Sequence, residues 1–593
     1  MLDPRIYRTG LVAVAMAVIV FAFSLQDMPG GFGTSLVPDA FSESHAAATM
    51  TQLASRWPDR RPGSDGDRQL AQYVAEQLAG DGFQVSRADF SAHTAFGTQV
   101  LENVWGTLAG ASDSTIVIVA HRDAAGTGAT SDLSGTAVLL ELARVLKGES
   151  ARHTIVLAST TATAGAAGAA QLTRDLPGPV DAVLVLGDLA PARVHQPLVV
   201  PWSNGQTVAP MTLRRTVAWA LGAQGEPAPA MPGLGGQLLH LAFPLALGEQ
   251  APFNDAGIPS VLISGSGEEP PSANELSTPA QLAAGQAQLQ SLGRTVLQSV
   301  NALDAGAAVP APSTYVLYDR KVIPVWAIRL LALALILPVA ITALDGLARA
   351  GRRGYGLGRL LGWALSWALA FVLAAIVIVL ARVVGLLSSA PAGAVPPGSG
   401  GPHGGGVATL VVAGLVAIAA VAFVRRWLMH LAFGSRGKGD YRGGGVAVTL
   451  VLCAVALVIW VRNPFAALLL VPALHLSLWF LAAELPLPRV ARLAGALLGF
   501  LGPIGAAVYY GVSLRLAPSQ VMWNGVLLLA RGQISPLTAL EWSVAFGCLV
   551  GSLVVAWRLP GREHEEPVAI TVRGPLTYAG PGSLGGTGSA IRR

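Results

Sequence analysis

Charged residues are scarce in this sequence. Asp, Glu, Lys and Arg make up only 12% of its 593 residues, whereas hydrophobic residues make up 52%. Soluble globular domains contain about 25% charged residues. The composition therefore excludes a chain that is soluble along its whole length, and it indicates that much of the chain lies in lipid.

Cysteine is almost absent as well. The two cysteines, Cys453 and Cys548, both lie in long apolar runs, which excludes a disulfide framework for the polar part of the chain. No Gly-x-Ser-x-Gly nucleophile elbow occurs in the predicted strands, and no Lys-Ser or Lys-Thr follows the glycine runs at 404–406 and 443–445. The sequence therefore favours neither a serine hydrolase nor a phosphate-binding loop.

Eight apolar runs are predicted to cross a bilayer, whose hydrocarbon core of about 30 Å requires about 20 helical residues. We interpret the first run, 11–25, as an uncleaved anchor because residues 25–29 offer no small-x-small cleavage site. A shorter run, 521–530, is predicted to be re-entrant or interfacial. The remaining seven runs are 322–344, 360–386, 407–424, 446–461, 465–483, 493–512 and 540–557.

Lys and Arg residues predict the orientation of these spans. They crowd the loops 349–359 and 425–442, and such loops lie on the cytoplasmic side. We therefore predict a multi-pass protein of the cell membrane with both termini in the cytoplasm. Its predicted parts are an N-terminal anchor at 1–27, an extracytoplasmic domain at 28–318, a bundle of about seven transmembrane helices at 319–558 and a disordered cytoplasmic tail at 559–593.

The sequence pI of 9.4 reflects this topology and not a nucleic-acid partner. Residues 28–318 contain 14 Lys and Arg against 24 Asp and Glu, a net charge of −10. Because the whole chain has a net charge of +5, the rest of the chain has a net charge of +15. The positive charge thus flanks the membrane. Within the predicted bundle, we interpret His475 as a neutral, hydrogen-bonded histidine. The expected partners are membrane lipid and a peptide-like ligand or a partner membrane protein, with no nucleic acid.

Helix-like and strand-like segments alternate in the predicted external domain, which indicates an α/β fold. The helix at 67–78 has an apolar face, and another helix is predicted to be capped by Ser134. A closing helix passes through 289–303. The predicted strands are 100–108, 115–120, 154–159 and 182–186.

Three polar residues follow predicted strands, at the ends where functional groups gather in such sheets. His121 and Asp123 come directly after the strand 115–120, and Asp188 comes after 182–186. His121 and Asp188 could bind zinc, with Asp123 orienting the imidazole. The alternative is that all three are polar loop residues with ordinary hydrogen bonds.

Several stretches of the predicted external domain form a recognisable series. They are 61–64 (RPGS), 102–104 (ENV), 118–123 (IVAHRD), 132–137 (DLSGTA) with 139–144 (LLELAR), 154–156 (TIV), Asp188, and 252–253 (PF) with 256–259 (AGIP). With these stretches, residues 51–303 resemble the M28 family of di-zinc aminopeptidases. This resemblance implies a mixed sheet with helices on both faces, beside the all-α transmembrane bundle.

The resemblance also implies site residues. Members of the family hold two zinc ions with a His, a bridging Asp, a Glu, an Asp and a final His. His121 and Asp188 match the first His and the later Asp, and Asp123 matches the residue that orients the His. The bridging Asp falls on Ser131, so Asp132 could bridge only if the loop shifts.

Other parts of that site are missing. The Glu ligand and the neighbouring Glu that serves as general base should follow the strand 154–159, but no carboxylate occurs between residues 150 and 174, and Ala273 stands nearest to the place of the final His. A general base contributes a factor of about 10² to 10⁴ to such reactions. We therefore expect zero or one zinc ion in preference to two. Replacement ligands could come from Asp132, Glu268, Glu269, Glu275 or His240.

Three functions remain open from the sequence. The leading hypothesis is a non-catalytic binding or assembly module that keeps the scaffold of a peptidase but has a degenerate site. The alternative is an active zinc-dependent membrane aminopeptidase or carboxypeptidase with a rearranged metal site. A transporter with an accessory domain is the third, although the C-terminal spans contain few buried charges and no evident repeat.

Overall fold

The computed structural model of the chain describes residues 4–94, 97–124, 130–191, 196–229, 231–268, 279–387, 404–433, 441–482, 485, 487–514 and 516–559. The predicted tail lies outside the described residues except for Leu559. The sequence-based candidates Glu269 and Glu275 and the position Ala273 also lie outside them.

A seven-stranded mixed sheet forms the centre of the polar domain. Its strands are β2 (Gln84–Thr94), β3 (Gly97–Leu108), β4 (Thr115–His121), β5 (Thr154–Thr160), β6 (Val180–Leu186), β7 (Leu198–Val200) and β8 (Ser260–Ser264). They are arranged in the order β2-β3-β5-β4-β6-β8-β7. The middle strands β5, β4, β6 and β8 are parallel, and β2, β3 and β7 pair antiparallel.

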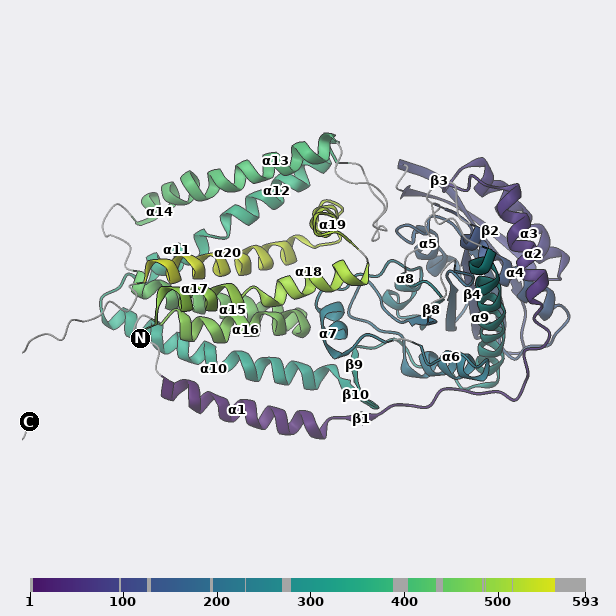
Figure 1. The fold of residues 1–593 in the computed structure, drawn as a ribbon, viewed down its shortest axis with the longest axis horizontal. Coiled ribbons are helices and arrows are strands. Elements are labelled where there is room, and N and C mark those ends of the chain that lie inside the picture. The colour runs from purple at the N-terminus through teal and green to yellow at the C-terminus, as the bar shows by residue number, and fades with distance from the viewer. Residues whose placement is uncertain are drawn as a thin grey trace, which may run out of the picture.

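Both faces of this sheet are covered, because alternate side chains of each strand point to opposite faces. In β4, Ile116 and Ile118 join one apolar cluster, whereas Val117 and Val119 join another. Helices lie on both sides of the sheet (Figure 1), which confirms the predicted α/β fold class. The cluster that contains Ile116 and Ile118 includes residues of α2 (Glu43–Arg56), α3 (Asp65–Gly80), α4 (Ser134–Leu146), α6 (Met211–Ala223) and α9 (Pro279–Ala305). The cluster that contains Val117 and Val119 includes residues of α5 (Ala167–Asp175), α7 (Leu234–Ala242) and α8 (Gln250–Asp255).

One predicted helix start is wrong. Ser134 is the first residue of α4 and not its cap, because a 3₁₀ turn at Thr130–Leu133 leads directly into the helix and places Leu133 at the N-cap. The Ser134 hydroxyl donates instead to the carbonyl of Ser131 at 2.6 Å, and it accepts from the N–H of Leu189 at 2.9 Å. Ser134 thus ties α4 to the end of β6.

The second half of the chain is helical. Among the described residues, five helical segments are long and apolar enough to cross a membrane: Val325–Arg352, Leu357–Val383, Gly404–Ala432, Gly443–Arg462 and Pro536–Arg558. Arg489–Leu498 and Leu501–Ser513, bent by 49°, make a sixth if they form one span, and Tyr7–Phe23 and Pro464–Phe480 are shorter apolar helices. All eight predicted spans are therefore helical, and five or six of them meet this test of length and composition.

The helices of the bundle are α1 (Pro4–Phe23), α10 (Val325–Arg352), α11 (Leu357–Ser366), α12 (Leu369–Val383), α13 (Gly404–Ala419), α14 (Arg425–Phe433), α15 (Tyr441–Arg462), α16 (Pro464–Phe480), α17 (Arg489–Leu498), α18 (Leu501–Ser513), α19 (Pro518–Ala530) and α20 (Pro536–Arg558). Figure 1 shows the polar domain at one end of this bundle and the N-terminus at the other end. Helix α19 is seen end-on near the domain, so it lies across the direction of its neighbours (Figure 1). The re-entrant or interfacial placement of 521–530 stays a prediction.

His475 joins three helices of the bundle. Its Nε2 lies 2.9 Å from the carbonyl oxygen of Leu335 in α10, and its Nδ1 lies 2.8 Å from the hydroxyl of Tyr7 in α1. Because a carbonyl can only accept, Nε2 carries the hydrogen, and Nδ1 is free to accept from the tyrosine. These contacts suit the neutral histidine that the sequence predicts.

A small antiparallel sheet connects the polar domain to the bundle. It consists of β1 (Gln26–Asp27), β10 (Lys321–Pro324) and β9 (Tyr315–Tyr318) in that order. Strand β1 follows α1, and β10 leads directly into α10. The predicted domain boundary at 318/319 falls in the turn between β9 and β10.

Side-chain hydrogen bonds join the same two parts. The side-chain amide of Asn463 donates to the carbonyl oxygens of Leu241 at 2.9 Å and Ala242 at 3.2 Å. The hydroxyl of Tyr510 donates to the carbonyl oxygen of Phe243 at 2.5 Å. The end of α7 is therefore fixed to α16 and α18.

Candidate functional site

Polar side chains gather at the carboxyl ends of the parallel strands. His121 ends β4 and pairs with Thr160 at the end of β5, and Asp188 follows the end of β6 by two residues. All three residues are buried. Since β5, β4 and β6 are parallel neighbours, their ends meet at one edge of the sheet. The fold therefore brings the predicted residues His121 and Asp188 to the same edge.

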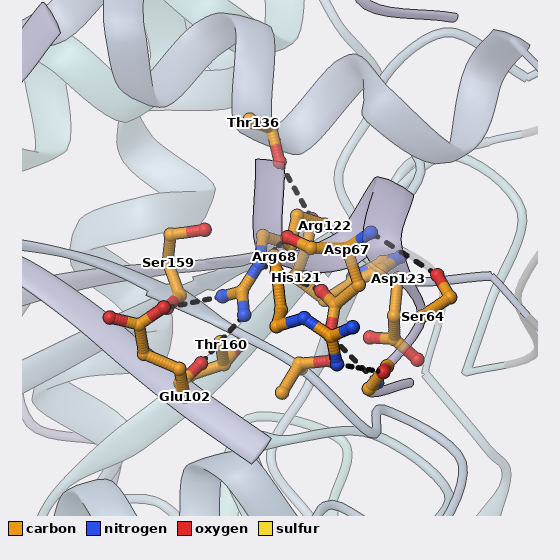
Figure 2. Close-up of polar contacts among 12 residues, drawn as sticks. Ser64, Asp67, Arg68, Glu102, His121, Arg122, Asp123, Thr136, Ser159 and Thr160 are labelled. Atoms are coloured by element: carbon orange, nitrogen blue, oxygen red, sulfur yellow. Dashed lines mark hydrogen bonds and ion pairs between the residues drawn. The ribbon is translucent and has the colours of Figure 1, made fainter. Parts of the chain in front are cut away.

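Arg122, next to His121, has a structural role. Its Nε lies 2.8 Å from Oδ1 of the buried Asp67. Its other nitrogens donate to the carbonyl oxygens of Ser159 at 3.1 Å and Glu102 at 2.6 Å, as the dashed lines in Figure 2 show. Asp67 also accepts from the hydroxyl of Thr161 at 2.9 Å. This buried charge is thus satisfied by partners from α3, β3 and β5.

Asp123 binds the loop that follows β5. Its carboxylate accepts from the N–H of Thr163 at 3.2 Å and from the Thr163 hydroxyl at 2.8 Å. Burial, together with the charge of Asp67, raises the pKa of Asp123 to about 6, although the hydrogen bonds from Thr163 and the charge of Arg122 act to lower it. The orienting role towards His121 that the resemblance assigns to Asp123 stays a prediction.

The loop after β5 is strained. Ala162 (φ 58°) and Ala166 (φ 53°) both adopt the left-handed conformation, which costs of order 1–3 kcal/mol for a residue with a side chain. The resemblance puts the missing carboxylate pair after β5, where the chain has 160–165 (TTATAG) and no carboxylate. Strained backbone of this kind concentrates at functional sites.

An arginine that the sequence analysis did not single out lies among the candidate ligands. Arg60 is fully buried, and its Nη2 is 3.9 Å from Oδ2 of the buried Asp132. Burial lowers the pKa of Arg60, whereas the charges of Asp132 and Asp123 raise it. The same cation also acts on His121. A guanidinium therefore supplies positive charge within a group of residues that the sequence associates with a metal.

His121 is neutral at physiological pH. Burial and the charge of Arg60 lower its pKa to about 4. Its Nε2 has no hydrogen-bond partner among the described residues. Its backbone is fixed because the Thr136 hydroxyl donates to the His121 carbonyl oxygen at 2.7 Å (Figure 2). The imidazole is thus a buried group with one unsatisfied nitrogen.

Glu249 is a second site residue that the sequence analysis missed. It precedes α8 and is buried, and neither carboxyl oxygen has a hydrogen-bond partner within the described part of the chain. Burial raises its pKa to about 8; nearby Thr160 and Arg122 lower it and Asp123 raises it. Glu249 therefore lies near the end of β5 and is protonated at neutral pH. The available signal was its position shortly before Pro252 and Phe253, which resemble the family's sequence.

The donor groups of the described residues are not arranged as a metal centre. Among the described residues, no three His, Cys, Asp or Glu side chains are placed to hold a metal ion together. Asp188 Oδ1 accepts from the N–H of Ala190 at 3.1 Å. Two of the residues suggested as replacement ligands have other contacts. The ring of His240 stacks on the ring of Trp202, with 4.3 Å between their centroids, and the carboxylate of Glu268 accepts from the N–H of Leu247 at 2.7 Å.

Comparisons with known proteins agree with the predicted family resemblance. Residues 103–198 match the model of peptidase family M28, and this stretch contains His121, Asp123, Asp132 and Asp188. No curated protein sequence matches the chain.

Among solved structures, a zinc aminopeptidase from Bacillus subtilis is 14% identical, covering 44% of this chain and 94% of its own, with a TM-score of 0.35. A glutaminyl cyclase from Porphyromonas gingivalis is 18% identical, covering 44% and 99%, with a TM-score of 0.34. A leucine aminopeptidase precursor from Bacteroides thetaiotaomicron is 15% identical, covering 44% and 97%, with a TM-score of 0.36.

Proposed function

Since residues 103–198 match peptidase family M28, we propose that this protein is a membrane-anchored, peptidase-like binding module that does not cleave its ligand. Its polar domain lies outside the cytoplasm and binds a peptide-like ligand or a partner membrane protein. The bundle anchors this domain in the cell membrane, and both termini are cytoplasmic.

The single observation that carries this proposal is the position of Arg60. Its guanidinium is buried 3.9 Å from Asp132 and exerts its charge on Asp123 and His121. A second cation placed in this group would be repelled by the first. The cluster is thus neutralised by the protein's own side chain, and the stretch 160–165, where the resemblance expects the general base, has no carboxylate.

The neutral groups around Arg60 support binding of a peptide-like ligand. A protonated Glu249 offers a hydroxyl donor in an apolar setting, as buried carboxylic acids can, and the neutral His121 offers Nε2. Both kinds of group hydrogen-bond amides and carboxylates.

The orientation in the membrane rests on charge and on helix placement. Helix α10 ends with Arg349 and Arg352, and α14 begins with Arg425 and Arg426. Both of these ends lie at the end of the bundle away from the polar domain, near the N-terminus (Figure 1). Loops rich in arginine stay in the cytoplasm, so the polar domain is assigned to the opposite side.

Metal content and hydrolysis of the purified full chain test this function together. After dialysis, elemental analysis is expected to find no zinc, and aminoacyl nitroanilides are expected to show no hydrolysis that a chelator abolishes. One or two zinc ions per chain, with chelator-sensitive hydrolysis that disappears in His121→Ala, would contradict the proposal. The exposed His93 on β2 provides the control variant His93→Ala.

A second candidate is the enzyme with a rearranged site. It is favoured by Glu249, because a carboxyl group with a raised pKa near neutrality is suited to general acid–base catalysis. In this case hydrolysis should fall by about 10²-fold or more in Glu249→Gln, and it should be retained in His93→Ala. Equal activity of Glu249→Gln and the unaltered protein would exclude this candidate.

A further inference from the structure

A large cavity lies where the bundle meets the polar domain, outside the site described above. Its volume is about 900 Å³, at the upper end of the range for small-molecule sites. Its walls come from α12, α18, α19 and α20, with the segment 242–247 of the polar domain at one end. Figure 1 shows α12 and α20 running towards the domain, and α19 lying across that end of the bundle.

The cavity is polar at its domain end and apolar further into the bundle. The polar end includes Arg462, Asn463, Arg531 and Glu541, and the walls further along α12 and α20 include Phe371 and Phe546. The rings of these two phenylalanines are 5.8 Å apart. Thr538 and Phe546 both line the cavity, so it follows α20 for about 12 Å at 1.5 Å per residue. Its shape and polarity suit an amphiphile.

Of the two arginines described at the polar end, Arg462 has an ion-pair partner and Arg531 has none. Arg462 pairs with Glu541 at 2.9 Å, which neutralises both groups. Arg531, at the C-cap of α19, makes no ion pair with any described residue, and its buried Nε has no hydrogen-bond partner among them. A charge that is partly removed from water requires a counter-charge. Among the described residues, the cavity therefore combines apolar walls with a positive charge, that of Arg531, which has no ion-pair partner.

We propose that this cavity binds one anionic phospholipid, with its phosphate against Arg531 and an acyl chain extending towards Phe371 and Phe546. A guanidinium offers phosphate oxygens parallel hydrogen bonds, and the apolar walls offer the acyl chain the burial that it has in the bilayer. Asn463, which also holds the end of α7, lines the same cavity. A bound lipid therefore contacts the joint between bundle and polar domain. This inference is independent of the proposed function of the M28-like domain.

Native mass spectrometry of the full chain in detergent tests the site, with dioleoyl phosphatidylglycerol as the probe. We expect one saturable binding event that is at least 10-fold weaker for Arg531→Gln. Dioleoyl phosphatidylcholine is expected to bind at least 10-fold more weakly than phosphatidylglycerol, and inorganic phosphate is expected not to compete. Arg489→Gln is the matched control, because Arg489 is an exposed arginine at the start of α17 that does not line the cavity.

A second variant tests the acyl-chain end separately. Ala375 lines the cavity on α12, so Ala375→Trp should fill it and abolish the saturable event. Equal binding of the two lipids, unchanged binding in Arg531→Gln, an equal loss in Arg489→Gln, or displacement by inorganic phosphate would each overturn the proposal. If Ala375→Trp does not fold, the pair Arg531→Gln and Arg489→Gln still decides it.

Discussion

Arg60 and Arg61 are adjacent in the chain but lie in opposite environments. Arg60 is fully buried beside Asp132, whereas Arg61 and its partner Asp59 are about half exposed. A buried ion pair that loses one member leaves an uncompensated charge in a medium of low dielectric constant. An exposed pair is screened by water and salt. The two arginines therefore allow the same substitution to be compared in two settings.

We predict that Arg60→Met destabilises the protein by about 3 kcal/mol or more, because it removes the cation beside the buried Asp132. Arg61→Met should leave the thermal unfolding midpoint nearly unchanged. In the double variant Arg60→Met with Asp132→Asn, part of the loss should be recovered. Thermal unfolding in detergent, followed by tryptophan fluorescence, measures all three. Equal midpoints for the two single variants would contradict a buried ion pair.

Glu249 should make stability depend on pH. Its pKa is about 8 in the folded protein against an ordinary value of 4.5, so the folded state favours the protonated form. Its contribution to stability is therefore fully present below about pH 4.5 and is lost as the pH rises through about 8. The amide of Glu249→Gln mimics the protonated form and cannot ionise. The midpoints of the two proteins should agree at about pH 5, and Glu249→Gln should unfold at a higher temperature at about pH 9. A pH-independent difference would contradict the raised pKa.

Helix α7 is the element that joins the polar domain to the bundle. Besides donating to the carbonyl oxygens of Leu241 and Ala242, Asn463 caps α16, because its side-chain oxygen accepts from the N–H groups of Phe465 and Ala466, both at 3.0 Å. One side chain thus ends one element and begins another. The two roles use different atoms, so substitutions can separate them.

Asn463→Asp should keep the cap of α16 and lose the bonds to α7, because a carboxylate accepts but does not donate. We expect faster amide hydrogen exchange in 234–242 and unchanged exchange at the start of α16. Asn463→Ala should speed exchange in both places. Hydrogen exchange followed by mass spectrometry resolves these segments, and identical patterns for the two variants would contradict the division of roles.

At the scale of the whole molecule, the proposed orientation in the membrane can be tested at the two ends of the bundle. The polar domain lies at one end of the bundle, and the N-terminus lies at the other end (Figure 1). Cys453 and Cys548 are both buried in the bundle, so the unaltered chain offers little thiol background. Single cysteines introduced at exposed positions can therefore report which side of the membrane each end occupies.

Ser55→Cys on α2 should react with a membrane-impermeant maleimide in intact cells. Arg353→Cys, in the turn after α10, should react only after the membrane is permeabilised, because arginine-rich loops remain cytoplasmic. Both positions are exposed. Labelling of Arg353→Cys in intact cells would reverse the orientation.

Local pattern was sufficient to predict the elements that carry the predicted site. The β-branched run at 115–120 predicts a strand buried on both faces, and β4 spans Thr115–His121 with every residue buried. The apolar periodicity at 67–78 predicts α3 within two residues at each end. These signals are local, because propensity and periodicity act over a few residues. The start of α4 was predicted wrongly because a preceding 3₁₀ turn, and not a hydroxyl cap, begins that helix.

Sequence alone established the apolar spans, the α/β class and the absence of the carboxylate pair after β5, because each depends on composition or on residues close together in the chain. Only the tertiary structure decided which charges meet. Arg60 and Asp132 are 72 positions apart, and Arg60 and Arg61 differ by burial and not by residue type. Glu249, which precedes α8, lies near Thr160 at the end of β5, 89 positions away in the chain. Electrostatic energies depend on distance and dielectric environment, and the folded chain sets both.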